Sequence, residues 1–159
     1  MRGDWAVFDI DGVLADVRHR LHHLRRRPKD WGAFFSAAAD DPPLEEGLRL
    51  AREQATGHRL AYVTGRPEGL RTVTQNWLDA HRLPTGPLLM RSRRDHRPAR
   101  VVKLELLVAL SARAPIGLVV DDDPDVVDTL RRTGLTVQHA RWVVREDVLR
   151  AAQDDEGRT

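Results

Sequence analysis

The stretch VFDIDGVLAD, residues 7–16, decides how this chain folds. An apolar run over residues 5–10 indicates a buried strand, and Gly12 indicates the turn that ends it. Two acids, Asp9 and Asp11, stand one residue apart where this strand ends. Because side chains of an extended chain alternate in direction, the two carboxylates are expected to point to different sides. Alone, such a pair fits a solvated strand end, and only the residues placed beside it elsewhere in the chain can indicate a chemical use.

Outward from this stretch, strand and helix patterns alternate along the chain. Strands are predicted at residues 59–63, 87–90, 116–120 and 135–138, and helices at residues 44–56, 67–80, 101–110 and 125–132. Pro67 is expected in the first turn of its helix, where proline is favoured. Such alternation means right-handed crossovers, and hence a mostly parallel sheet with helices on both faces. The predicted fold class is α/β, three-layered and Rossmann-like, with a central parallel sheet.

One stretch, residues 16–43, interrupts the alternation directly after the first strand. It carries Trp31, Phe34 and Phe35 at helical spacing, which indicates a folded segment packed on the domain. Insertions of this length are usually functional when they are ordered, so we expect a small helical cap. Residues 1–159 are expected to form a single domain, with a polar C-terminal tail at about residues 153–159 that frays.

Composition excludes several classes of protein. The 159 residues are 41% hydrophobic and 31% charged, which is typical of a soluble globular chain. No apolar run approaches the roughly 20 residues that span a bilayer, and the N-terminus lacks a signal-peptide core. The absence of cysteine excludes a disulfide framework and a thiolate metal site, and fits a cytoplasmic protein. Arginine fills the lysine and arginine positions except Lys29 and Lys103, and the net charge is only +2. We interpret this wide use of arginine as background composition and not as a nucleic-acid surface.

Polar groups follow three of the predicted strands. In an open parallel sheet, ligands bind outside the carboxyl ends of the strands. These ends carry Asp9 and Asp11, then Thr64-Gly65-Arg66, then Asp121-Asp122-Asp123, and Lys103 lies near the start of a helix. Carboxylates with no thiol or histidine beside them form a hard oxygen site, which suits Mg²⁺.

These groups are the parts that phosphoryl transfer requires. Asp9 can attack phosphorus, and Asp11 can supply a proton to the leaving group. Thr64, the amide of Gly65, Arg66 and Lys103 can hold the phosphate oxygens. Asp122 and, second, Asp121 are the predicted metal ligands, and Asp123 and Asp125 are expected to cap the next helix or face solvent.

Four motifs in order, DIDGVLAD, VTGR, Lys103 and VVDDD, resemble those of the haloacid dehalogenase-like (HAD) phosphatases over nearly the whole chain. Within that superfamily the chain is similar to the phosphatase domain of polynucleotide kinase–phosphatases. That similarity rests on Arg20 and on the stretches DWGAFF, TGRPEGLRTVTQNWL and LLMRSRRDHRPARVVKLELL. The chain departs from this pattern at Ala99, where an acid is usual, and at Asp123, where a basic residue is usual. It also contains no GxxxxGKS or GxxxxGKT loop, so no kinase half is expected within these residues.

The resemblance implies a HAD fold and a Mg²⁺-dependent phosphomonoesterase that forms an aspartyl-phosphate on Asp9. The implied metal ligands are Asp9, the carbonyl of Asp11, and Asp122 or Asp121. The implied substrate is a nucleotide or a nucleic-acid 3′-phosphate end. Arg20 is expected to bind phosphate and Trp31 to lie near the base. No membrane contact and no obligate protein partner are expected.

Two other functions remain open at this stage. The same machinery could hydrolyse small metabolites such as sugar phosphates. A non-catalytic module that binds RNA through its arginines is disfavoured, because it would not need the acid pair together with Lys103. His19, His22, His23 and the run of arginines at residues 25–27 are interpreted as a solvated face.

Overall fold

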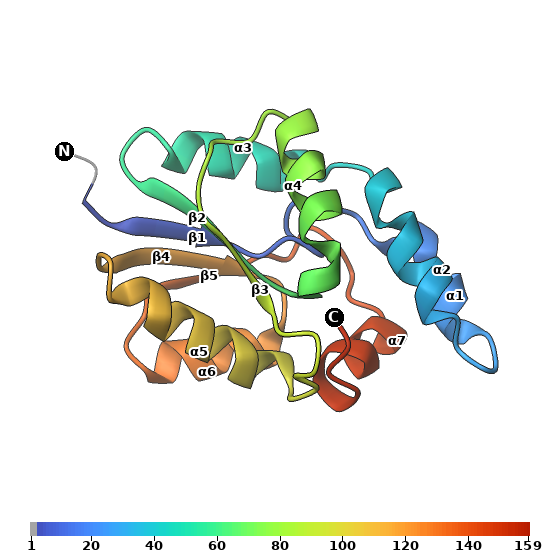
Figure 1. The fold of residues 1–159 in the computed structure, drawn as a ribbon. Coiled ribbons are helices and arrows are strands. Elements are labelled where there is room, and N and C mark those ends of the chain that lie inside the picture. Colours follow the sequence, from blue (N-terminus) through green and yellow to red (C-terminus); the bar gives the residue numbers. More distant parts are fainter. Residues whose placement is uncertain (1–2) are drawn as a thin grey trace.

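The computed structural model describes residues 3–159 and contains a five-stranded parallel sheet in the order β3-β2-β1-β4-β5 (Figure 1). The strands are β1 (Trp5–Phe8), β2 (Arg59–Pro67), β3 (Leu88–Arg91), β4 (Ile116–Asp121) and β5 (Val137–His139). Every residue of β1 is buried, as expected for the central strand of a parallel sheet covered on both faces. The predicted α/β class is confirmed.

Two helices cover each face of this sheet. Figure 1 shows α3 (Glu45–Gln54) and α4 (Arg71–Ala80) on one side, and α5 (Ala99–Ser111) and α6 (Pro124–Arg132) on the other. Each pair buries an apolar core against the strands. One core includes Phe8 and Trp77, and the other includes Val7 and Leu107. Because β1 supplies alternate side chains to both cores, its end is held rigidly between them.

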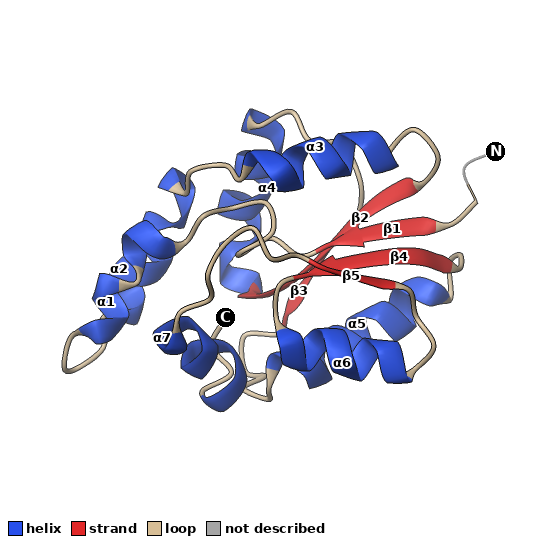
Figure 2. Cartoon of the chain, turned by 180° about the vertical axis from the view of Figure 1, so that it is seen from behind, coloured by secondary structure: helices blue, strands red, loops and turns tan. Residues whose placement is uncertain are grey.

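The insert after β1 forms the predicted small helical cap. It contains a 3₁₀ turn (Arg18–Arg20), α1 (His22–Arg25), α2 (Trp31–Ser36) and a second 3₁₀ turn (Ala37–Asp40). Both views show α1 and α2 beyond one end of the sheet, on the side where β1 ends (Figures 1 and 2). Phe34 is fully buried in the cap core, which supports a packing role for the aromatic residues of α2.

Pro67 does not lie in the first turn of a helix, as the sequence predicts, but at the end of β2. A 3₁₀ turn (Glu68–Leu70) separates it from α4, which begins at Arg71. Pro67 stays in the sheet because it still pairs with Arg91 of β3, after a shift of register that follows Thr64. The longer strand therefore includes Arg66.

The C-terminal residues pack on the domain, so the prediction of a frayed tail is wrong. α7 (Asp147–Arg150) continues into a π-helical turn (Ala151–Asp155), and both views place α7 between the cap and α6. Leu149 and Ala152 complete the apolar core of the cap. The polar residues of this segment are paired with distant partners, as in the contact of Glu156 with Lys29. Within residues 3–159, no helix combines the length and apolar character needed to cross a membrane.

Candidate active site

Three carboxylates meet where β1 and β4 end. Asp9, Asp121 and Asp122 each offer an oxygen within 4.8 Å of the other two, and all three are buried. The sheet explains this arrangement, because neighbouring parallel strands end at the same edge. The amide of Asp9 still donates to Val120 at 3.0 Å, so strand pairing continues up to the acids and fixes their positions.

Lys103 lies against this cluster from α5. Its Nζ is 2.6 Å from Asp121 Oδ2 and 3.1 Å from Asp9 Oδ2, and the lysine is buried. Burial alone would lower the pKa of Lys103, but Asp121 and Asp9 outweigh it and raise that pKa. The ammonium therefore stays charged beside the carboxylates.

One ammonium does not balance three carboxylates. Burial, aided by Asp121 and Asp122, raises the pKa of Asp9 well above its ordinary value even though Lys103 opposes it. Burial and the charge of Asp121 raise the pKa of Asp122 to about 7. A further cation would relieve this excess of negative charge.

The donor set fits Mg²⁺. The three clustered side chains are all carboxylates, whose oxygens are the type of ligand that Mg²⁺ prefers. Asp121 uses both of its oxygens, on Lys103 and on the amide of Asp123. In contrast, Asp122 Oδ1 is buried without a hydrogen-bond partner among residues 3–159, and Asp9 Oδ2 has only its ion pair with Lys103. These two oxygens are the ones that a bound cation would satisfy.

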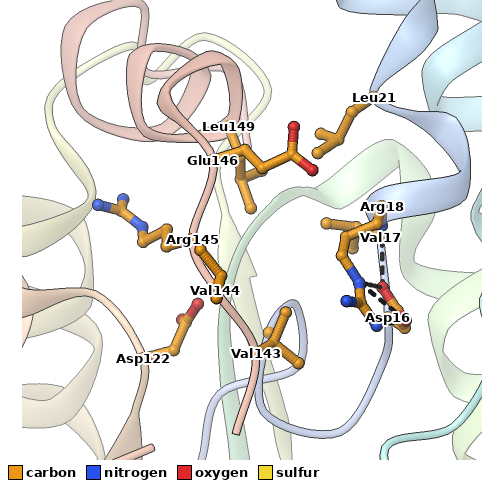
Figure 3. A pocket seen from close by; sticks show the side chains of 11 residues that line it. Asp16, Val17, Arg18, Leu21, Asp122, Val143, Val144, Arg145, Glu146 and Leu149 are labelled. Carbon is orange, nitrogen blue, oxygen red and sulfur yellow. Dashed lines mark hydrogen bonds and ion pairs between the residues drawn. The ribbon is translucent and has the colours of Figure 1, made fainter. Parts of the chain in front are cut away.

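Gly12 makes this arrangement possible. Its φ of 80° lies in the region that favours glycine, and a Cβ there would lie 2.1 Å from Asp122 Oδ2. Figure 3 shows Asp122 beside a small pocket that Gly12 also lines, facing Val143, Val144 and Arg145. The turn after β1 and the segment before α7 thus meet next to the carboxylates.

Asp11 is turned toward two arginines instead of the carboxylate cluster. Its Oδ1 accepts from Arg66 Nε at 2.9 Å and Nη2 at 2.6 Å, and from Arg20 Nη2 at 3.4 Å. Burial raises the pKa of Asp11, but Arg66 and Arg20 outweigh it and bring that pKa below its ordinary value. Asp9 and Asp11 therefore have opposite environments, in keeping with the different directions expected of neighbouring residues.

A second buried acid, Asp41, shares the two arginines, and the sequence analysis missed it. Arg20 donates to both of its oxygens, at 2.8 and 3.0 Å, and Arg66 Nη2 donates to Oδ2 at 2.8 Å. His19 Nε2 also lies 2.6 Å from Oδ1. In the sequence, Asp41 belongs to an ordinary-looking polar loop before two prolines and carries no motif that could have revealed it.

Of the remaining predicted residues, two lie near the carboxylate cluster and one lies in the cap. Thr64 and Gly65 lie at the end of β2, next to the strand that carries Asp9, and Thr64 is buried. Trp31 packs within the cap, where the ring centroids of Trp31 and Phe35 are 6.0 Å apart. The Arg158 guanidinium carbon lies 4.5 Å from the centroid of the Trp31 ring. Arg158 thus occupies the kind of position at which a base was expected.

Comparison with known proteins now identifies the family. Residues 4–141 match the model of the polynucleotide kinase PNKP phosphatase domain. The chain belongs to this family. Its members are HAD phosphatases, so this chain is a phosphatase enzyme. The matched range contains Asp9, Asp11, Thr64, Lys103 and Asp122, whereas Arg145 and α7 lie beyond it.

Solved structures agree on the fold. A Pnkp1/Rnl/Hen1 complex contains a chain with a TM-score of 0.72 and 23% identity, over 91% of this chain and 48% of that one. A haloacid dehalogenase-like hydrolase from Streptococcus pneumoniae gives 0.63 and 12%, over 96% and 91%. The HAD-hydrolase YfnB from Bacillus subtilis, solved with magnesium, gives 0.61 and 11%, over 86% and 88%. A search of curated proteins found no match. This chain spans about half the length of the chain that it matches in the Pnkp1/Rnl/Hen1 complex.

Proposed function

We propose that this phosphatase is a Mg²⁺-dependent phosphomonoesterase that forms an aspartyl-phosphate on Asp9. The observation that carries the proposal is the buried group of Asp9, Asp121 and Asp122 with Lys103 in contact. Bound by these acids, Mg²⁺ would neutralise charge on the phosphate oxygens. The unpartnered oxygen of Asp122 supports this site.

Each residue near the carboxylates has a role in the proposed reaction. The carboxylate of Asp9 attacks phosphorus, and the bond from phosphorus to the leaving oxygen breaks. The Lys103 ammonium, the Thr64 hydroxyl and the amide of Gly65 bind the oxygens of the transferring phosphoryl group. Asp11 in its protonated form gives a proton to the leaving oxygen, and the carboxylate so formed then takes one from the water that hydrolyses the aspartyl-phosphate. Asp9 and Asp11 both return to their starting states.

A nucleotide or a nucleic-acid 3′-phosphate end is the proposed substrate. The family match supports it, and a second structural relative, 24% identical over 87% of this chain and 42% of that one, comes from the Pnkp1/Rnl/Hen1 RNA repair complex. The cap adds Arg20 beside Asp11, where a guanidinium favours an anionic substrate. Ala99, where the resemblance implies an acid, is a buried residue at the start of α5, four residues before Lys103.

A substrate screen tests the proposal. The chain would be assayed with Mg²⁺ and with excess chelator on nucleoside 3′- and 5′-monophosphates, a 3′-phosphorylated oligonucleotide and sugar phosphates, alongside Asp9→Asn. Phosphate release that needs Mg²⁺ and Asp9 and is fastest for 3′-phosphates is expected. Undiminished release in chelator would overturn the metal role, and preference for sugar phosphates would replace the substrate assignment.

A further inference from the structure

The buried acid Asp41 has no part in the reaction described above. Its side chain is fully buried where the cap returns to the domain, directly after the second 3₁₀ turn. Its position is fixed from the sheet side, because Trp77 Nε1 of α4 donates to its carbonyl at 2.8 Å. A buried carboxylate is costly unless its partners are well arranged, so these partners indicate what it does.

Asp41 and Asp11 share the same guanidinium groups. Arg66 Nη2 lies 2.8 Å from Asp41 Oδ2 and 2.6 Å from Asp11 Oδ1, so this one nitrogen joins the two acids. Arg20 Nη2 does the same, at 3.0 Å from Asp41 and 3.4 Å from Asp11. Asp41 is thus linked to the proton-transfer residue through two arginines.

The far ends of both arginines are also held. Arg66 Nη1 donates to Thr74 Oγ1 at 3.2 Å, and Arg20 Nη1 donates to the Phe34 carbonyl at 3.3 Å. A guanidinium is planar, so contacts on several nitrogens fix its orientation. Without Asp41, Arg20 would keep only the 3.4 Å contact to Asp11 as an ion pair, and two buried cations would share one carboxylate.

From this geometry we propose that Asp41 is a positioning residue, which holds Arg20 and Arg66 so that they orient the Asp11 carboxylate for proton transfer. The inference rests on the proposed function, since Asp11 must act on the leaving group. The Asp41 carboxylate contacts Arg20, Arg66 and His19, and not the carboxylates of Asp9, Asp121 and Asp122. Its effect on proton transfer passes through the two arginines to Asp11.

Such a role predicts a dependence on the leaving group. An alkoxide, as from a nucleoside 3′-monophosphate, leaves poorly unless it is protonated, whereas p-nitrophenolate leaves without a proton. General acid catalysis typically contributes about 100- to 10,000-fold, so misplacing Asp11 affects the first ester far more. A contact that only stabilised the fold, or only helped the arginines grip phosphate, would affect both esters equally.

The experiment compares kcat/KM for a nucleoside 3′-monophosphate and p-nitrophenyl phosphate with Mg²⁺ present. For each ester, kcat/KM reports on the steps up to the first phosphoryl transfer, before water attacks the aspartyl-phosphate. For Asp41→Asn we expect a loss of about 10- to 100-fold on the nucleotide and under about 3-fold on the aryl ester. Asp11→Asn should show the same selectivity with a larger loss. Asp40→Asn, at the exposed neighbouring position, should match wild type on both esters.

Equal losses on the two esters in Asp41→Asn, or no loss, would overturn the inference. If that variant does not fold, Arg20→Lys decides in its place, because it keeps the charge but loses the planar fork. It should show the same selectivity, and equal losses would again contradict the inference. Inactivity of the wild-type enzyme toward both esters would instead remove the proposed function.

Discussion

Lys103→Met tests how the charges of the site are balanced. Lys103 is the cation that contacts Asp9 and Asp121, at 3.1 and 2.6 Å. Removing one partner of a buried ion pair typically costs about 3 to 5 kcal/mol, because it leaves the other charge uncompensated. At about 2 to 4 °C per kcal/mol for a domain of this size, the metal-free variant should melt roughly 6 to 20 °C below wild type.

The loss of melting temperature in Lys103→Met should depend on pH and on Mg²⁺. Acids whose pKa lies above the ordinary value can regain neutrality by binding a proton, so the difference in melting temperature should be smaller at pH 5.5 than at pH 8. At pH 8, Mg²⁺ should restore much of the stability, because it supplies positive charge to the same oxygens. Turnover should stay low, since no ammonium then binds the phosphoryl group.

The chain offers its own control for this measurement. Lys29, the other lysine, pairs with Glu156 at the surface, and such a pair contributes at most about 1 kcal/mol. Thermal melts in chelator at pH 5.5 and pH 8, with and without added Mg²⁺, would compare Lys103→Met, Lys29→Met and wild type. The reasoning is refuted if Lys103→Met melts no lower than Lys29→Met in chelator at pH 8.

Three further predictions concern neighbouring residues. Because the pKa of Asp122 is about 7, the folded metal-free protein keeps a proton between about pH 4 and pH 7 that the unfolded chain has lost, so its melting temperature should fall as pH rises through that window. Asp122→Asn should weaken this fall and remove the stabilisation by Mg²⁺. An unchanged profile of melting temperature against pH in this variant would contradict the prediction. Gly12→Ala should lower both the melting temperature and Mg²⁺ affinity, measured by calorimetry, because its Cβ would meet Asp122 Oδ2 at 2.1 Å; wild-type affinity would count against that site. Since the pKa of Asp11 is lowered, this carboxyl is mostly ionised at neutral pH, and its protonated fraction grows as pH falls. The ratio of kcat/KM for a nucleoside 3′-monophosphate to kcat/KM for p-nitrophenyl phosphate should therefore rise toward acid pH. A ratio that stays constant from pH 5.5 to 8 would exclude Asp11 as the acid.

The sequence predicts the carboxylate cluster well, because strand topology alone brings its members together. Asp9 follows β1, and Asp121 and Asp122 follow or end β4. An apolar run marks each strand, and parallel neighbours end at one edge, so no side-chain detail is needed to place these acids. Lys103 is singled out by its place in the order of the motifs, near the start of a helix.

Contacts that depend on how the cap docks could not be predicted in this way. Asp41 meets Arg20 and Arg66 across 21 and 25 residues of chain, and only the path of the insert brings them together. For the same reason a polar C-terminal segment was expected to fray, although Arg145 binds Asp123 at 3.0 Å and Asp154 at 2.9 Å. Composition predicts solvation for such residues, whereas their distant partners place them in the interior.

The covalent role of Asp9 is tested most directly by trapping the intermediate. The enzyme would be mixed with Mg²⁺ and a nucleoside 3′-monophosphate, quenched in acid within a turnover, and digested for peptide mass spectrometry. We expect the mass of one phosphoryl group on Asp9 in the wild-type protein, and neither adduct nor turnover in Asp9→Asn. A phosphoryl group on a different residue, or wild-type turnover by Asp9→Asn, would contradict attack by Asp9.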